Sequence, residues 1–261
     1  MTYFLGGYLM KPLNFRVIFE DKHILACYKP PQIATQSCSI RTPDMVSLAK
    51  NHLAGTKAAS ASSERPTNCS GGRRASSGEI YLGVIHRLDQ PVGGILVFAK
   101  TPSAAKNLSA QLAAGSFGKY YRALVDGVPD APTGTVTDYL VRDGRTNMSR
   151  ICAKDTPGAK YASLKYSIVE QEHALFRSQK DTADPSLPRT ELDICLDTGR
   201  HHQIRVQLAG LGCPIVGDAK YNLNTPRKNS GQYLCLCAYK LTFTHPKTNE
   251  PLQFELGTGY F

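Results

Sequence analysis

Residues 83–100 read Gly-Val-Ile-His-Arg-Leu-Asp-Gln-Pro-Val-Gly-Gly-Ile-Leu-Val-Phe-Ala-Lys. Positions 93–100 are apolar on both faces of an extended chain, as a central strand covered on both sides requires. Charged loops at the edge of such strands are common places for functional side chains. We therefore expect a buried strand at 93–100, preceded by a polar loop that carries His86, Arg87 and Asp89.

Strand patterns also dominate the chain on either side of this stretch. Two short strands around a polar turn are expected at 15–29, and further strands at 118–125, 160–170, 189–197, 233–244 and 252–256. Helices are expected at 44–54, 102–114 and 200–210, the last with an apolar stripe of Ile204, Leu208 and Leu211. Because strands and helices do not alternate regularly, we predict an α+β fold with a mixed, largely antiparallel central sheet and a few flanking helices.

The composition changes sharply at 55–78, which is rich in Ala, Ser, Gly, Arg and Lys and has almost no large apolar residue. Such a segment buries too little apolar surface to offset the entropy lost on ordering. We expect a flexible surface insertion there. The rest of 15–261 is expected to form one domain, preceded by an N-terminal segment at 1–14.

Charge and hydropathy limit the partners and the compartment. Lys and Arg total 31 against 21 Asp and Glu, a net charge of +10 that favours a polyanion, although many basic proteins bind no nucleic acid. No apolar run is long enough to span a bilayer and no signal peptide is evident, so we expect a cytoplasmic protein without membrane contact. The eight cysteines contain no Cys-x-x-Cys pair, which favours reduced thiols over zinc or disulfides.

Two further segments concentrate polar residues. Residues 197–205 read Asp-Thr-Gly-Arg-His-His-Gln-Ile-Arg and begin the last expected helix. Adjacent histidines diverge on a helix, so His201 and His202 do not predict a metal site. In the strand at 118–127, Tyr120 and Tyr121 point to opposite faces, and from the residues alone a core or interface aromatic is the better explanation of either one.

The loop around Asp89 has competing interpretations. A polar loop with a local Arg–Asp pair explains it without any function. His-Arg-Leu-Asp is superficially similar to the catalytic loop of protein kinases, but the Gly-rich loop, the Asp-Phe-Gly motif and the catalytic-loop Asn of kinases are absent from the sequence. A kinase is therefore excluded.

Together, the three segments resemble the RluA-type family of pseudouridine synthases. The family's His-Arg-Leu-Asp motif is matched at 86–89, and its Thr-Gly-Arg-x-His-Gln-Ile-Arg motif at 198–205. Its Lys-x-Tyr-x-Ala-x-Val-x-Gly strand is matched by Lys119, Tyr121, Ala123, Val125 and Gly127. The sequence departs from the family pattern at Gln90, Val92-Gly93 and His201, positions that bear on the choice of RNA.

This resemblance implies the pseudouridine synthase fold and the isomerisation of one uridine in ribosomal or transfer RNA. It assigns catalysis to Asp89. It also implies that the substrate or Asp89 itself is contacted by Tyr121, Arg205, Arg87 and His86. The carboxylate either captures C1′ covalently or removes a proton from C2′, and both routes stay open. No step transfers electrons or phosphate, so no cofactor or metal is implied, and we expect a monomer.

Two other classes of function remain as alternatives. A non-catalytic RNA-binding protein explains the charge but does not need Asp89, Tyr121 and Arg205 together. A hydrolase with an aspartate nucleophile explains Asp89 but not the basic composition. Formation of pseudouridine from uridine-containing RNA separates the three.

Overall fold

The structure is a computed structural model that describes residues 4–5, 8–9, 15–37, 42–63, 79–170, 173–176, 188–224 and 233–257. Of the expected N-terminal segment at 1–14, it describes only β1 (Phe4–Leu5) and β2 (Tyr8–Leu9), which pair with each other in antiparallel fashion. The remainder of that segment lies outside the described residues.

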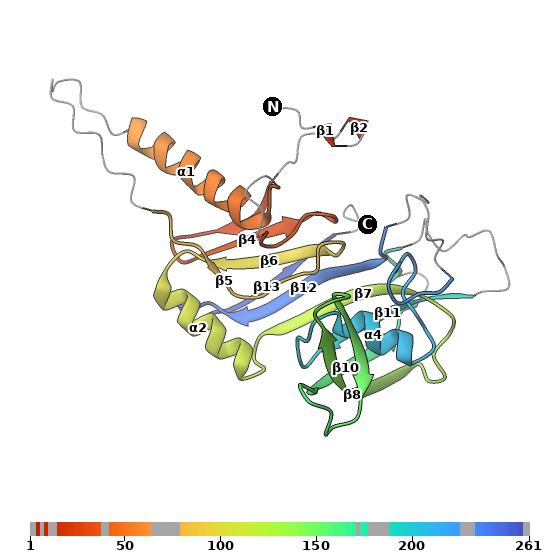
Figure 1. Ribbon diagram of the computed structural model, residues 1–261. Helices are drawn as coiled ribbons and strands as arrows, with labels where there is room; N and C mark the ends of the chain where they lie inside the picture. The colour runs from red at the N-terminus through yellow and green to blue at the C-terminus, as the bar shows by residue number, and fades with distance from the viewer. Residues whose placement is uncertain are drawn as a thin grey trace, which may run out of the picture.

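One sheet of 11 strands organises the described chain (Figure 1). Its path runs through β3 (Arg16–Glu20), β4 (Ile24–Lys29), β6 (Gly93–Ala99), β12 (Leu236–Thr244), β7 (Gly118–Asp126), β11 (Arg189–Leu196), β10 (Lys160–Ile168), β8 (Thr133–Asp143) and β9 (Met148–Cys152). In addition, β5 (Gly83–Val84) pairs with β6, and β13 (Pro251–Glu255) pairs with β12. Among the described pairs, only β6 and β12 are parallel, which confirms the predicted mixed, largely antiparallel sheet.

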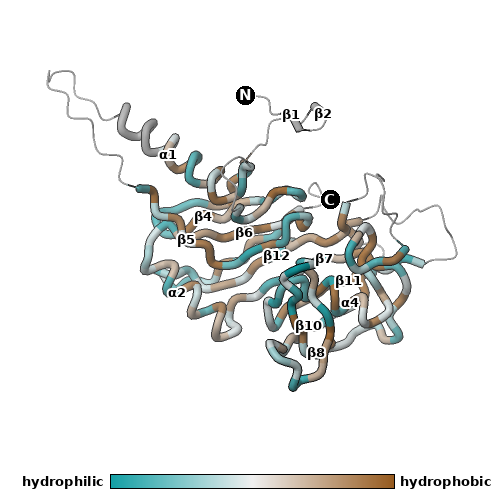
Figure 2. Tube along the Cα trace, in the orientation of Figure 1, coloured by the Kyte–Doolittle hydropathy of each residue, from teal (hydrophilic) through white to brown (hydrophobic). Residues whose placement is uncertain are grey.

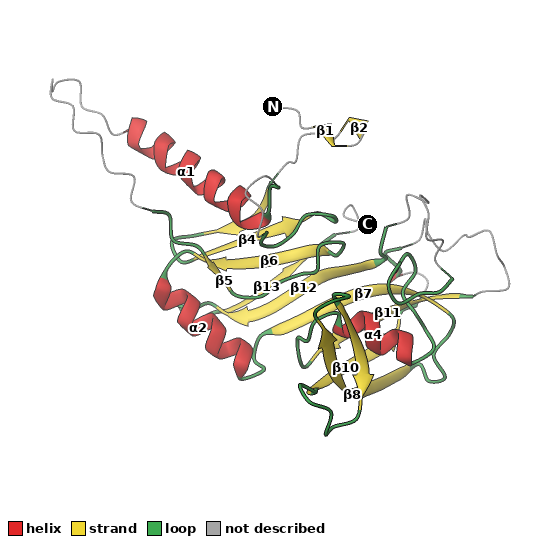
Figure 3. Ribbon diagram, in the orientation of Figure 1, coloured by secondary structure: helices red, strands yellow, loops and turns green. Residues whose placement is uncertain are grey.

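Three described helices lie against different parts of the sheet (Figure 3). They are α1 (Met45–Ser63), α2 (Pro102–Ala113) and α4 (Gln203–Gly210). The start of α2 is set by Thr101, whose hydroxyl accepts a hydrogen bond from the Ala104 N–H at 3.2 Å, and by Pro102 in the first turn. Helix α2 packs on β6 and β12, whereas α4 packs on β8 and β9.

Two expectations about helices are wrong in detail. Helix α1 continues to Ser63 instead of ending at 54, so the first part of the expected insertion is helical; its alanines are strong helix formers. The rest of that insertion, 64–78, lies outside the described residues. Leu211 follows the end of α4 and is 39% exposed, so the apolar stripe of this helix consists of Ile204 and Leu208 without it.

The core follows the central strands, where hydrophobic residues concentrate (Figure 2). Every residue of β6 is buried, as the run at 93–100 predicts. The residues at the ends of these strands therefore sit on a rigid base, and the loop that enters β6 carries Asp89.

Gly94 allows β6 and β12 to approach each other. Its φ is +139°, and a Cβ there would lie 2.5 Å from the carbonyl oxygen of Ala238 in β12. Strain and overpacking together predict that Gly94→Ala lowers the free energy of unfolding by about 3 kcal/mol. Urea unfolding measures this, with Gly144→Ala, at an open position, as the control. Equal midpoints for the two variants would contradict the close approach.

Candidate active site

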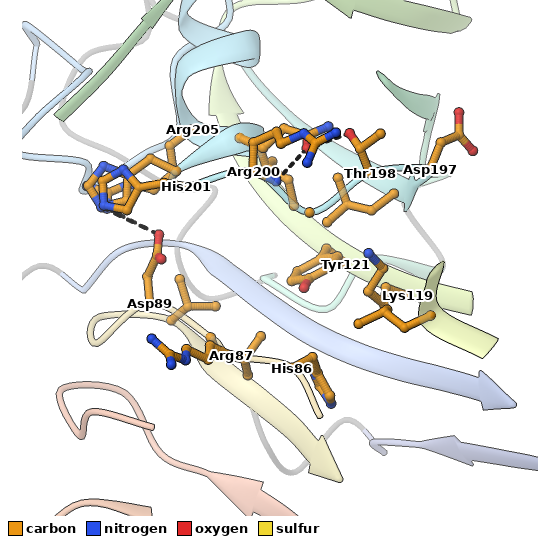
Figure 4. Close-up of a pocket in the computed structure, with 18 of the residues that line it drawn as sticks. His86, Arg87, Asp89, Lys119, Tyr121, Asp197, Thr198, Arg200, His201 and Arg205 are labelled. Carbon is orange, nitrogen blue, oxygen red and sulfur yellow. Dashed lines mark hydrogen bonds and ion pairs between the residues drawn. The ribbon is translucent and has the colours of Figure 1, made fainter. Parts of the chain in front are cut away.

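A cleft of about 740 Å³ opens between several segments of the chain. Most of its lining comes from the loop between β5 and β6, strand β7, the residues that follow β11 and the first turn of α4, and α2, β8 and β12 add further residues. Figure 4 shows the polar side chains that converge on it, with Asp89 and Arg205 on one side and Lys119 and Asp197 on the other.

Asp89 is held in place by bonds to the residues around it. The Leu88 N–H donates to the Thr35 hydroxyl at 3.1 Å, and that hydroxyl donates to the Leu88 carbonyl oxygen at 3.0 Å. On the other side, the fully buried Lys29 ammonium donates to the carbonyl oxygens of Pro30, Gln90 and Val92, at 3.1, 3.0 and 2.5 Å. The loop is thus fixed before and after Asp89, whose side chain is 30% exposed.

Arg205 lies beside Asp89, where the resemblance expects it. Its Nη1 is 3.5 Å from Asp89 Oδ2. The same guanidinium makes two shorter hydrogen bonds to the buried Asp218, from Nε at 2.8 Å and from Nη2 at 2.7 Å. Burial lowers the pKa of Arg205, but the hydrogen bonds and charge of Asp218 outweigh it, and the pKa is raised. Asp218 therefore fixes the orientation of the guanidinium, whose remaining nitrogen, Nη1, faces Asp89.

His202 is a second donor toward Asp89, with its Nε2 3.7 Å from Oδ2. The Tyr221 hydroxyl accepts from the Ser149 N–H at 2.7 Å and lies 2.8 Å from His202 Nδ1, so we assign its own proton to that nitrogen. Nε2 then carries the imidazole proton and points it at the carboxylate. Burial and the neighbouring Arg205 lower the pKa of His202 to about 3, which keeps the ring neutral at physiological pH.

The backbone of His202 is also unusual, because φ is 54° in a residue other than glycine. This left-handed residue stops α4 from extending toward residue 200 and explains why the helix begins at Gln203. The His201 ring stacks on the His202 ring at 3.8 Å between centroids.

Tyr121 is the tyrosine of β7 that faces the cleft. It is 7% exposed, and burial, followed by the charge of Asp89, raises the pKa of its hydroxyl. Tyr120 points to the other face, where Lys240 Nζ lies 4.8 Å from the centre of its ring.

His86 and Arg87 occupy different surroundings. His86 is buried in the wall of the cleft, where its Nε2 accepts a hydrogen bond from the Val97 N–H at 3.2 Å. Burial, followed by the charge of Lys119, lowers the pKa of His86 to about 3. Arg87 is exposed at the rim of the cleft, as are Arg142 and Arg200. A buried imidazole that binds the backbone of β6 supports the loop from within, whereas these three arginines face solvent.

The geometry suits a reaction at a nucleotide. One carboxylate faces two N–H donors, an aromatic ring lies next to it, and cations surround the opening. Within the ranges that the structure describes, no group of three or more His, Cys, Asp and Glu side chains is arranged to hold a metal ion. No helix among the same residues is long and apolar enough to cross a membrane.

Comparisons with known proteins agree on one family. Residues 23–210 match the family model described as RNA pseudouridylate synthase. An RNA pseudouridine synthase of Bacillus subtilis strain 168, YlyB, is 30% identical over 250 residues, which are 95% of this chain and 70% of that protein. The ribosomal large subunit pseudouridine synthase D of Zymomonas mobilis is 27% identical over 250 residues, 93% of this chain and 69% of that protein.

The chain spans 51% to 70% of the length of such curated relatives. Among solved structures, human RNA pseudouridylate synthase domain containing 1 superposes with a TM-score of 0.67 at 19% identity, covering 95% of this chain and 86% of the human one. At that identity the likeness concerns the fold alone.

Proposed function

The chain belongs to the RluA-type family of RNA pseudouridine synthases, and on this premise we propose that it isomerises a uridine of a structured RNA with Asp89 as the catalytic carboxylate. The observation that supports Asp89 most directly is its position. It is the carboxylate in the cleft that faces both a fixed guanidinium, at 3.5 Å, and an imidazole nitrogen, at 3.7 Å.

The reaction breaks the bond between N1 of the uracil and C1′ of the ribose, and then joins C5 to C1′. C5 loses its proton and N1 takes one up, so the net change is an isomerisation. The electron pair of the broken bond leaves with the base, so the sugar carbon becomes electron-poor. Asp89 then either forms an ester to C1′ or accepts the C2′ proton to give a glycal. Both routes need a negative carboxylate, and the Arg205 guanidinium lies 3.5 Å from it.

RNA enters the cleft with its target base unstacked, because a base inside a helix is out of reach. We assign the exposed Arg87, Arg142 and Arg200 to the phosphates around the target, and His86 to holding the loop beneath Asp89. Ribosomal RNA is the first substrate to test, since two of the relatives carry the name ribosomal large subunit pseudouridine synthase D, and transfer RNA is the second.

The direct test incubates the purified protein with unmodified ribosomal and transfer RNA and measures pseudouridine by nucleoside chromatography. Pseudouridine formation supports the proposal, and mapping the modified positions names the substrate. Release of free uracil without pseudouridine would indicate a hydrolase. RNA binding without either product would indicate a non-catalytic protein.

Replacing Tyr121 tests the base platform. Tyr121→Ala removes a ring whose stacking on a base is worth about 1–3 kcal/mol, so kcat/KM is expected to fall by roughly 10- to 100-fold. Tyr121→Phe keeps the ring, so any loss of kcat/KM in this variant measures the contribution of the hydroxyl. We assign to that hydroxyl assistance in removing the C5 proton. Tyr120→Ala, on the opposite face of the same strand, is the matched control. Equal losses for Tyr120→Ala and Tyr121→Ala would point to damage of β7 instead of lost stacking.

A further inference from the structure

Lys119 places an ammonium group in the cleft. Because side chains alternate along a strand, Lys119 and Tyr121 project from the same face of β7, about 7 Å apart along the strand. Lys119 is 7% exposed and lines the cleft, and a Cβ at Gly199 would come within 3.3 Å of its Nζ. Figure 4 shows Lys119 on the side of Tyr121 opposite to Asp89.

Among the described residues the Lys119 ammonium has no hydrogen bond and no ion pair within 4 Å, although the charge of Asp197 acts on it favourably and that of Arg200 unfavourably. Two other buried cations among the described residues are held by hydrogen bonds. Lys29 donates to three carbonyl oxygens, and Arg205 is held by both oxygens of Asp218. Burial is the main cause that lowers the pKa of Lys119. A largely buried cation without a hydrogen-bond partner among the described residues is unfavourable for folding, and such groups concentrate at functional sites.

We propose that Lys119 donates a hydrogen bond to a carbonyl oxygen of the target uracil and stabilises the negative charge that the ring acquires when the bond between N1 and C1′ breaks. This inference rests on the proposed function of the site. With C1′ at Asp89 and the ring against Tyr121, the pyrimidine extends along β7 toward Lys119.

The chemistry of the leaving group matches a cationic donor. The electron pair of the broken bond stays on N1 and is delocalised onto O2 and O4. A donor aimed at one of these oxygens binds more strongly as the charge develops, and it lowers the barrier because it is already oriented and largely dry.

The same donor also serves the rejoining step. For C5 to take the place of N1 beside C1′, the uracil turns half a revolution about the axis through N3 and C6, and this turn exchanges O2 with O4. One fixed ammonium therefore faces an equivalent oxygen before and after the turn. Lys119 accordingly retains the free base while it changes orientation, and no change in the protein is required.

The test compares Lys119→Met with wild type under single-turnover conditions on the RNA identified above. Methionine is unbranched and apolar, so it fills the buried site without a charge. The rate constant is expected to fall about 100-fold, as for loss of one oxyanion donor, with RNA affinity unchanged. Lys247→Met, at an exposed turn outside the cleft, controls for the loss of one positive charge. Lys119→Gln keeps a neutral hydrogen-bond donor, so its rate constant is expected to fall less. This variant replaces Lys119→Met in the test if the methionine variant is unstable.

Thio-substituted RNA identifies the contact, because sulfur is a poor hydrogen-bond acceptor. A 2-thio or 4-thio group in the target uridine is expected to slow the wild-type enzyme when the replaced oxygen is the one that faces Lys119 in the rate-limiting step, with no further slowing in Lys119→Met. An unchanged rate constant in both Lys119→Met and Lys119→Gln would overturn the inference while leaving the proposed function intact. So would weaker binding with a smaller salt dependence at an unchanged rate constant, which would indicate a phosphate contact. If wild type makes no pseudouridine, the proposed function itself fails, and this inference with it.

Discussion

Asp89→Asn is expected to abolish pseudouridine formation while leaving the melting temperature and RNA affinity close to wild type. The amide keeps the size and shape of the carboxylate, so it fits between the same neighbours, Arg205 and His202. It has no negative charge to attack C1′ or to take the C2′ proton. Binding persists because phosphate contacts dominate RNA affinity, and Asp89 makes none of them.

Stability is also expected to persist, for a structural reason. Asp89 is 30% exposed, and Arg205 keeps both hydrogen bonds to Asp218 when Asp89 is neutral. The measurements are thermal unfolding, RNA affinity by filter binding, and pseudouridine yield. Asp155→Asn, an exposed carboxylate away from the cleft, is the matched control. A stable Asp89→Asn protein that makes pseudouridine at a substantial rate would end the assignment.

Local sequence patterns predicted the central sheet well because each pattern reflects a constraint that acts at its own position. The run at 93–100 is apolar on both faces, and β6 is buried throughout. The alternation in 118–125 predicted β7 and placed Tyr120 and Tyr121 on opposite faces. The polar loop before β6 is indeed at the edge of a cleft.

Several local features of the chain were missed as well. Helix α1 extends through an alanine- and serine-rich stretch, because helical propensity outweighs a composition typical of loops. The left-handed φ of His202 shortened the expected helix at 200–210, and nothing in its side chain predicts that conformation. No bounds were predicted for the strands β8 and β9.

The candidate site residues named from the sequence line one cleft, and Arg205 lies beside Asp89 as expected, but the bonds that hold Arg205 and His202 in place were not predicted. Asp218 and Tyr221 follow the helix motif in the sequence, yet their bonds to Arg205 and His202 form only because residues 213–221 turn back along α4. Lys119 stood in a recognised motif two residues before Tyr121. Strand alternation alone would have placed it on the same face, and that signal was available from the sequence.

Replacing Arg205 by Lys is expected to lower both the rate constant and the stability, because Arg205 is bonded to Asp218. Arg205→Lys keeps the positive charge but loses the planar fork that holds both oxygens of Asp218 while reaching Asp89. The rate constant is expected to fall by about 100-fold or more. The free energy of unfolding should fall by roughly 3 kcal/mol, because a buried ion pair loses its geometry. Single-turnover kinetics and urea unfolding measure the two effects separately.

Asp218→Asn tests whether the orientation of Arg205 matters apart from its charge. Asp218 is buried, is bonded to Arg205 and does not line the cleft, so the change leaves the charges inside the cleft unaltered. If Asp218 acts by orienting the guanidinium, this variant lowers the rate constant while RNA affinity stays the same, and combining it with Arg205→Lys adds little further loss. Arg189→Lys alters another largely buried arginine–aspartate pair, with Asp126 at 3.0 Å, and should affect stability without affecting the rate constant. Near-normal turnover in Arg205→Lys would mean that the arginine contributes only diffuse charge, and the orientation of Asp89 would then depend on His202 and on the fixed loop.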